Sequence, residues 1–108
     1  MEKERRSAPR VRVNLPARWE GVLMRISGSI SDLSRTGCFV LTGGEVEVRE
    51  LIWLEISLPD QEPIQVWAEV VDTAYEIGFA VRFNSCSDED QERLLRYIDS
   101  ILASQPSR

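Results

Sequence analysis

The sequence predicts a mainly β protein, a six-stranded antiparallel β-barrel followed by one C-terminal α-helix. Six short segments alternate apolar and polar residues with a period of two, which is typical of strands that bury one face. Glycine, proline and acidic residues separate these segments at hairpin-like distances. The last segment instead repeats its apolar residues with helical spacing.

The first two predicted strands form a hairpin that turns at Gly21. Before the turn, the expected inward face consists of Val11, Val13, Leu15, Ala17 and Trp19. After the turn, it consists of Val22, Met24, Ile26 and Ile30. We expect a turn over residues 32–37 to end this second strand.

Four more strands are expected further along the chain. They cover residues 38–42, 51–58, 64–70 and 77–83. The strongest turn signal between them is the run from Pro59 to Pro63. Because each strand has one apolar face, a small closed barrel, which leaves no open sheet edge, suits the pattern best.

A helix is predicted after Ser87, whose hydroxyl can cap the acidic residues 88–90 at the positive end of the helix dipole. We expect a helix of about 14 residues that packs on the barrel or on a partner. Its apolar stripe consists of Leu94, Leu95, Ile98, Ile101 and Leu102.

The 108 residues suffice for one domain. We expect a flexible arm over residues 1–9, the barrel and helix over residues 10–103, and a tail over residues 104–108. The sequence has no apolar run long enough to span a membrane and no signal peptide, so we expect a bacterial, cytoplasmic protein without membrane insertion.

Charge is distributed unevenly along the chain. Residues 1–25 hold seven basic and three acidic residues, whereas the rest holds six basic and fifteen acidic residues. An acidic body repels long nucleic acids, and we expect no DNA or RNA partner. The basic N-terminal segment favours a compact phosphorylated ligand.

The residue types and motifs that enzymes use for catalysis are scarce in this sequence. The chain contains no histidine, the commonest general base and metal ligand. Cys38 and Cys86 lack the spacing of metal or redox motifs, and we expect reduced structural thiols, with a disulfide between them left open. No nucleophile stands beside a base and no phosphate-binding glycine loop precedes a helix. We therefore expect no enzyme, no metal site and no cofactor.

Two short motifs flank the first predicted hairpin. The first contains Arg5, Arg6 and Arg10, whose planar guanidinium groups match phosphate oxygens or a guanine edge. The second runs from Asp32 to Gly37 and offers a carboxylate that can accept hydrogen bonds from guanine N–H groups. Alone, they are most simply a solvated basic tail and an ordinary turn. Since antiparallel strands bring both motifs to one end of the sheet, they can close on one ligand.

In order and spacing, these motifs resemble those of the PilZ domain, a bacterial receptor module for cyclic di-GMP. The family motif RxxxR corresponds to residues 6–10, and [D/N]xSxxG corresponds to residues 32–37. The segment Ile77–Phe83 also resembles the family's Gly-x-x-x-x-Phe strand. The resemblance covers about residues 5–100.

The resemblance implies a non-catalytic receptor whose arm orders around cyclic di-GMP and signals to a protein partner. The implied ligand-binding residues are Arg5, Arg6, Arg10, Asp32, Ser34 and Gly37, with Arg35 and Gly78 as further candidates. Arg6 and Arg10 would contact phosphates and guanine, and Asp32 would recognise a guanine edge. Arg5 would favour an intercalated ligand pair.

The sequence leaves two alternatives to the receptor function. The chain could be a PilZ-type protein-interaction adaptor that binds no nucleotide. A single-strand nucleic-acid binder would need stacking platforms along a basic groove, which this acidic body does not supply. Trp19 is expected in the core, whereas Trp53 and Trp67 are expected on the barrel exterior beneath the helix, with partner or ligand contact as alternatives.

Overall fold

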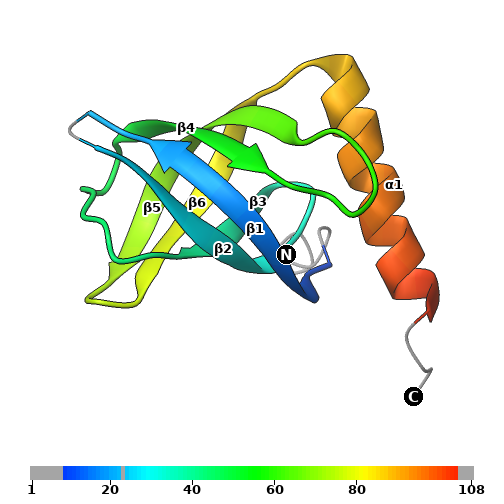
Figure 1. The fold of residues 1–108 in the computed structure, drawn as a ribbon, viewed down its shortest axis with the longest axis horizontal. Coiled ribbons are helices and arrows are strands. Elements are labelled where there is room, and N and C mark those ends of the chain that lie inside the picture. The colour runs from blue at the N-terminus through cyan, green and yellow to red at the C-terminus, as the bar shows by residue number, and fades with distance from the viewer. Residues whose placement is uncertain (1–8, 23, 105–108) are drawn as a thin grey trace, which may run out of the picture.

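The computed structural model describes residues 9–22 and 24–104 and consists of a closed antiparallel barrel with a helix across one end (Figure 1). The predicted fold class is confirmed. The elements are β1 (Val11–Glu20), β2 (Arg25–Leu33), β3 (Gly37–Leu41), β4 (Leu51–Ile56), β5 (Ile64–Ala74), β6 (Gly78–Ser85) and α1 (Asp88–Ser104). Most of the predicted arm (residues 1–8) and of the predicted tail (residues 105–108) lies outside the described residues.

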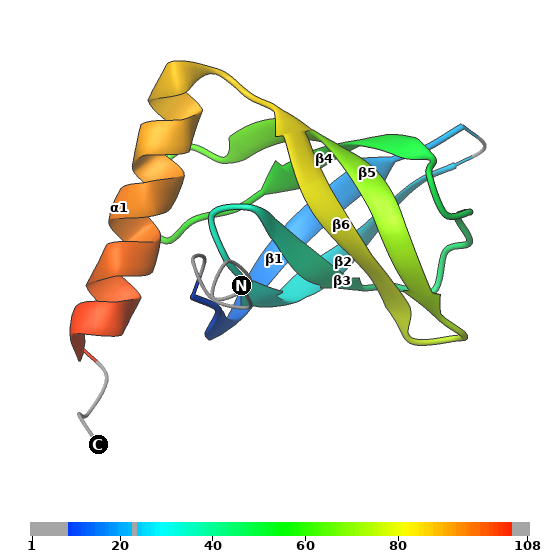
Figure 2. The ribbon, with the colours of Figure 1, turned by 180° about the vertical axis from the view of Figure 1, so that it is seen from behind.

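The strands follow the order β1-β2-β3-β6-β5-β4 around the barrel, and pairing of β4 with β1 closes it. All neighbouring strands are antiparallel. Because β3 and β4 are not neighbours, the connection between them crosses the barrel end that lies opposite α1 (Figures 1 and 2).

Inward side chains of all six strands form one core with the buried face of α1. Trp19 is fully inside, as predicted, and its ring meets Phe79 edge to face at 5.1 Å between centroids. The indole N–H of Trp19 donates to the Thr42 hydroxyl at 3.1 Å, so its one polar group is satisfied inside the barrel.

Three residues expected on inward faces are exposed instead. Val22, Met24 and Ile77 are 79%, 40% and 56% exposed to solvent. Their alternation is regular, but they precede β2 and β6 and lie in hairpin turns, closed by the hydrogen bonds from Gly21 N–H to the Met24 carbonyl and from Ile77 N–H to the Ala74 carbonyl. No opposite strand covers them there.

A bulge in β2 changes the direction of Asp32. Ile30 points inward, so uninterrupted alternation would bring Asp32 inward as well. The register with β3 instead shifts between Ile30 and Asp32, leaving Ser31 as the extra residue. Leu33 therefore becomes the inward residue, and Asp32 stays partly exposed within β2 rather than beginning a turn.

The helix begins as predicted, because Asp90 N–H donates to the Ser87 hydroxyl at 3.1 Å. It is 17 residues long, and Leu94 and Ile98 are buried against the barrel. Arg93 donates to the carbonyl oxygens of Glu62 and Pro63 at 2.6 and 3.1 Å. These bonds hold α1 to the connection between β4 and β5.

The tryptophans of β4 and β5 lie on the outer wall of the barrel. Trp53 and Trp67 are cross-strand partners, and their rings meet at 5.1 Å with an interplanar angle of 66°. The prediction that they lie beneath the helix is wrong, since α1 closes the barrel end and Trp67 remains 45% exposed.

Candidate functional site

The start of β1 and the end of β2 lie side by side, as the motif spacing predicts. Arg12 pairs with Asp32 across the two strands, and Val11 pairs with Leu33. One residue before β1, the Arg10 guanidinium Nη1 lies 3.2 Å from Asp32 Oδ1. An arginine of the first motif and the carboxylate of the second thus meet directly.

The Arg10–Asp32 pair remains open to solvent, with side chains 63% and 34% exposed. Exposed ion pairs contribute about 0–1 kcal/mol, so a ligand with its own phosphates and N–H donors can replace this contact at small cost. Both groups are charged and can accept a new partner.

Ser34 organises the turn between β2 and β3. Its N–H donates to the Gly37 carbonyl at 2.9 Å, and its hydroxyl accepts from Thr36 N–H at 3.1 Å. The hydroxyl also lies 3.1 Å from the Thr36 hydroxyl and is part of a residue that is only 4% exposed. In this structure the Ser34 side chain therefore stabilises the turn that follows Asp32 and Leu33.

Gly37 of β3 and Gly78 of β6 permit close contact between these two strands. A Cβ on Gly37 would collide with the carbonyl oxygen of Val81, and one on Gly78 would collide with that of Val40. Both collisions are with backbone atoms of the neighbouring strand. Gly37 and Gly78 are brought to the same strand pair, where they allow β3 and β6 to approach.

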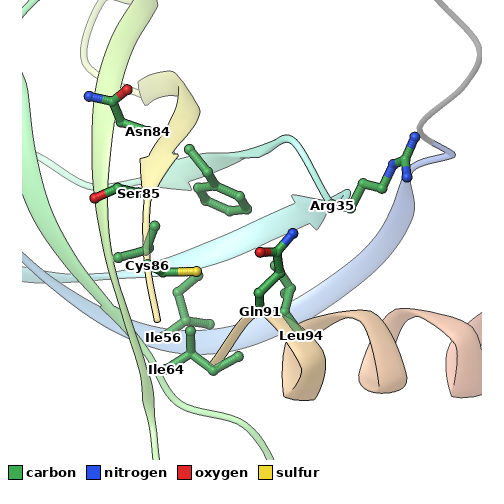
Figure 3. A pocket seen from close by; sticks show the side chains of 10 residues that line it. Arg35, Ile56, Ile64, Asn84, Ser85, Cys86, Gln91 and Leu94 are labelled. Carbon is green, nitrogen blue, oxygen red and sulfur yellow. The ribbon is translucent and has the colours of Figure 1, made fainter. Parts of the chain in front are cut away.

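Arg35 follows Ser34 in the turn and lines a cavity of about 130 Å³ between the barrel and α1 (Figure 3). Asn84 and Ser85 of β6 and Gln91 and Leu94 of α1 are also part of its lining. The turn and the start of the helix consequently share one cavity.

Two arginines of the first motif, Arg5 and Arg6, lie outside the described residues. The structure adds Phe39 and Arg82, which the motifs did not single out. Phe39 pairs with Asp32, and Arg82 pairs with Gly37 and forms an ion pair with Glu69 at 3.1 Å. Their outward positions in predicted strands were visible in the sequence, but their neighbours required the strand order.

Metal and thiol chemistry find little support in the described part of the chain. There, no three histidine, cysteine or acidic side chains are grouped to hold a metal ion. Cys38 and Cys86 are free thiols. Burial raises the pKa of Cys38 far above its usual range, and burial with the carboxylates of Asp90 and Asp88 raises that of Cys86. Neither is an activated nucleophile.

The PilZ domain model matches residues 4–100. The chain belongs to the PilZ domain family. The resemblance carried by the two motifs is confirmed at the level of the family. No curated protein matches the sequence directly. Within residues 9–22 and 24–104, no helix is long and apolar enough to cross a membrane.

Solved structures share this PilZ fold. The chain is similar to the Bacillus subtilis inhibitor of motility, MotI/DgrA, at 21% identity and a TM-score of 0.80, over 94% of this chain and 53% of that one. It is similar to Escherichia coli YcgR in complex with c-di-GMP at 17% identity and a TM-score of 0.77, over 92% and 46%. The YcgR PilZ domain with c-di-GMP gives 16% identity and a TM-score of 0.74, over 92% of both chains. The present chain spans about half the length of MotI/DgrA and full YcgR.

Proposed function

We propose that this PilZ domain is a non-catalytic receptor for cyclic di-GMP. The observation that carries the proposal is the direct contact of Arg10 with Asp32, at the end of the barrel where β1 begins and β2 ends. Family membership and the c-di-GMP complexes of YcgR give further support.

The proposed binding step exchanges one contact for several. Asp32 leaves Arg10 and accepts hydrogen bonds from the N1–H and N2–H₂ groups of one guanine. Arg10, Arg6 and Arg5 then hold phosphates and the guanine edge, with their planar faces available for stacking. Ser34 keeps the turn in place and Gly37 keeps it against β6. Two ligand molecules per chain would fit the extra arginine at position 5.

Ordering of residues 1–9 around the ligand is the proposed signal. These residues would form a ligand-coated surface beside β1 and the β2–β3 turn, and a protein partner would bind that surface. In this proposal the protein acts in the cytoplasm and binds neither DNA nor RNA.

Isothermal titration calorimetry with cyclic di-GMP tests the receptor role. We expect a saturable exothermic binding isotherm, and its stoichiometry measures whether the ligand binds as a pair. Cyclic di-AMP is the matched control, because adenine lacks the N1–H and N2–H₂ donors that Asp32 accepts; it should bind at least about tenfold more weakly.

The alternative is a PilZ-type adaptor that binds a protein without nucleotide. The outward-facing Trp67 favours some protein contact. Absence of heat at about tens of micromolar cyclic di-GMP, combined with partner binding that cyclic di-GMP leaves unchanged, would support the adaptor and overturn the receptor.

A further inference from the structure

A groove lies at the other end of β1, away from Arg10 and Asp32. It consists of two adjoining hollows of about 550 and 610 Å³ that share Val22 of the β1–β2 hairpin. The first is lined by Glu20, Gly21, Val22, Leu51, Trp53 and Trp67, and the second by Val22 and residues 45–50. Figures 1 and 2 show that this hairpin and the β3–β4 connection lie opposite α1. We call this surface the hairpin groove.

The lining of the hairpin groove includes four large apolar side chains that are exposed to solvent. They are Val22, Val48, Leu51 and Trp67, which are 79%, 52%, 50% and 45% exposed to solvent. Exposed apolar side chains that gather on one surface mark contact sites, and tryptophan is enriched among the residues that dominate binding energy.

The charged residues that line the hairpin groove are mostly acidic. Four glutamates line it, against one arginine, Arg49. Of these, Glu45 and Glu47 form no side-chain ion pair with any described residue. Their carboxylates therefore remain available to a cationic partner.

Glu50 holds the two walls of the hairpin groove in place. Its Oε2 accepts a hydrogen bond from Val22 N–H and its Oε1 accepts one from Glu47 N–H, both at 3.0 Å. Arg49, in the left-handed region at a φ of 83°, is fixed by its N–H bond to the Val70 carbonyl at 2.7 Å. A preformed groove loses little entropy when a partner binds.

We infer that the hairpin groove binds a cationic segment of a partner protein that carries lysine or arginine beside aliphatic or aromatic side chains. The apolar side chains would lie on Val22, Leu51 and Trp67, and the cations would face Glu45 and Glu47 or the Trp67 ring. A second copy of this chain fits poorly, because a twofold contact would bring the same carboxylates together. The surface is separate from the proposed nucleotide site, so both can be occupied together.

Selection of phage-displayed random dodecapeptides against the intact chain tests this inference. We expect the selected peptides to combine lysine or arginine with tryptophan, phenylalanine or leucine. In fluorescence anisotropy, the double variant Glu45→Lys/Glu47→Lys should bind such a peptide at least about tenfold more weakly, and so should Trp67→Ser. The matched control is Glu62→Lys/Asp99→Lys, which reverses the same number of exposed charges outside the groove and should bind within about twofold of wild type.

Several results would overturn the inference. These are selection of acidic peptides, selection of no peptide, or equal binding by the wild type and the Glu45→Lys/Glu47→Lys variant. A dimer of the chain that this double variant dissociates, seen by sedimentation velocity, would assign the groove to a second copy instead. If Trp67→Ser does not fold, the exposed glutamates still decide the result. Cyclic di-GMP titration of the same variants reports separately on the nucleotide site.

Discussion

Arg10 and Asp32 are joined by a single Nη1–Oδ1 contact of 3.2 Å, and both side chains are partly exposed to solvent. Such an exposed pair adds little to folding stability, and the proposed function gives both residues a role in ligand binding. Stability and binding are therefore separable at these two residues, which makes them good positions for substitution.

Replacing either residue should weaken ligand binding without loss of the fold. Arg10→Ala or Asp32→Ala should each reduce cyclic di-GMP affinity at least about tenfold, equal to about 1.4 kcal/mol, because a charge-assisted hydrogen bond is lost. Calorimetry measures the affinity and thermal denaturation measures the fold. Arg96→Ala, on the exposed face of α1, is the control and should bind normally. Unchanged affinity in both site variants would remove this pair from the site.

Gly37 should be needed for stability through the strand contact that it permits. Gly37→Ala would drive a Cβ into the Val81 carbonyl and should lower the free energy of unfolding by about 1–3 kcal/mol. Gly43→Ala is the matched control, because no atom lies within 4 Å of its added Cβ. Urea denaturation compares the two variants. Equal stability would mean that β3 and β6 separate more easily than the structure indicates.

Among the elements, α1 is held against the barrel by a few polar contacts at its first turns. Asp90 accepts a hydrogen bond from Gln65 N–H at 3.1 Å and contacts Arg93 at 2.8 Å, while Arg93 also donates to the β4–β5 connection. Burial acts to raise the pKa of Asp90, but these hydrogen bonds outweigh it and hold the pKa below its ordinary value of 3.8. The ionised carboxylate therefore stabilises the docked helix.

The sign of this shift predicts how the attachment depends on pH. A carboxyl group with a lowered pKa in the folded state stabilises the protein above its ordinary pKa, and the contribution disappears as the pH falls through the lowered value. Asp90→Asn should thus cost about 1 kcal/mol at about pH 6 and less at about pH 3. Urea denaturation at both pH values measures the difference. Asp99→Asn, exposed on the same helix, should show neither effect; a constant deficit in Asp90→Asn would contradict the ionic role.

At the scale of the whole molecule, pairing of β1 with β4 closes the barrel around its interior. Cys38 lies in this interior at 3% exposure, and burial raises its thiol pKa. It is therefore both covered and protonated near neutral pH, which removes the reactive thiolate.

Thiol labelling should follow from this closure. In a Cys86→Ser variant, Cys38 should react with a thiol reagent only as fast as global unfolding allows, so added urea should speed labelling in step with the loss of stability. In a Cys38→Ala variant, the partly exposed Cys86 should react faster in native buffer. Rapid native labelling of Cys38 would show that part of the barrel opens locally.

Strand number, the C-terminal helix and its Ser87 cap followed from local pattern, because side-chain period and capping depend on residues close together in the chain. The two motifs likewise predicted the meeting of the β1 start with the β2 end. The exposure of Val22, Met24 and Ile77 was not predictable in this way, since alternation continues into a turn whether or not an opposite wall is present.

Composition, periodicity and motif order were thus sufficient for the fold class and the family resemblance, and they predicted that the two motifs lie side by side. Tertiary structure alone decided that a bulge at Ser31 turns Asp32 outward, that Ser34 serves the turn, and that Val22 meets residues 45–50 in one groove. Register and enclosure depend on pairing between strands that are distant in the chain. A pattern read along one strand specifies which side chains alternate, whereas only the closed barrel determines which neighbours they meet.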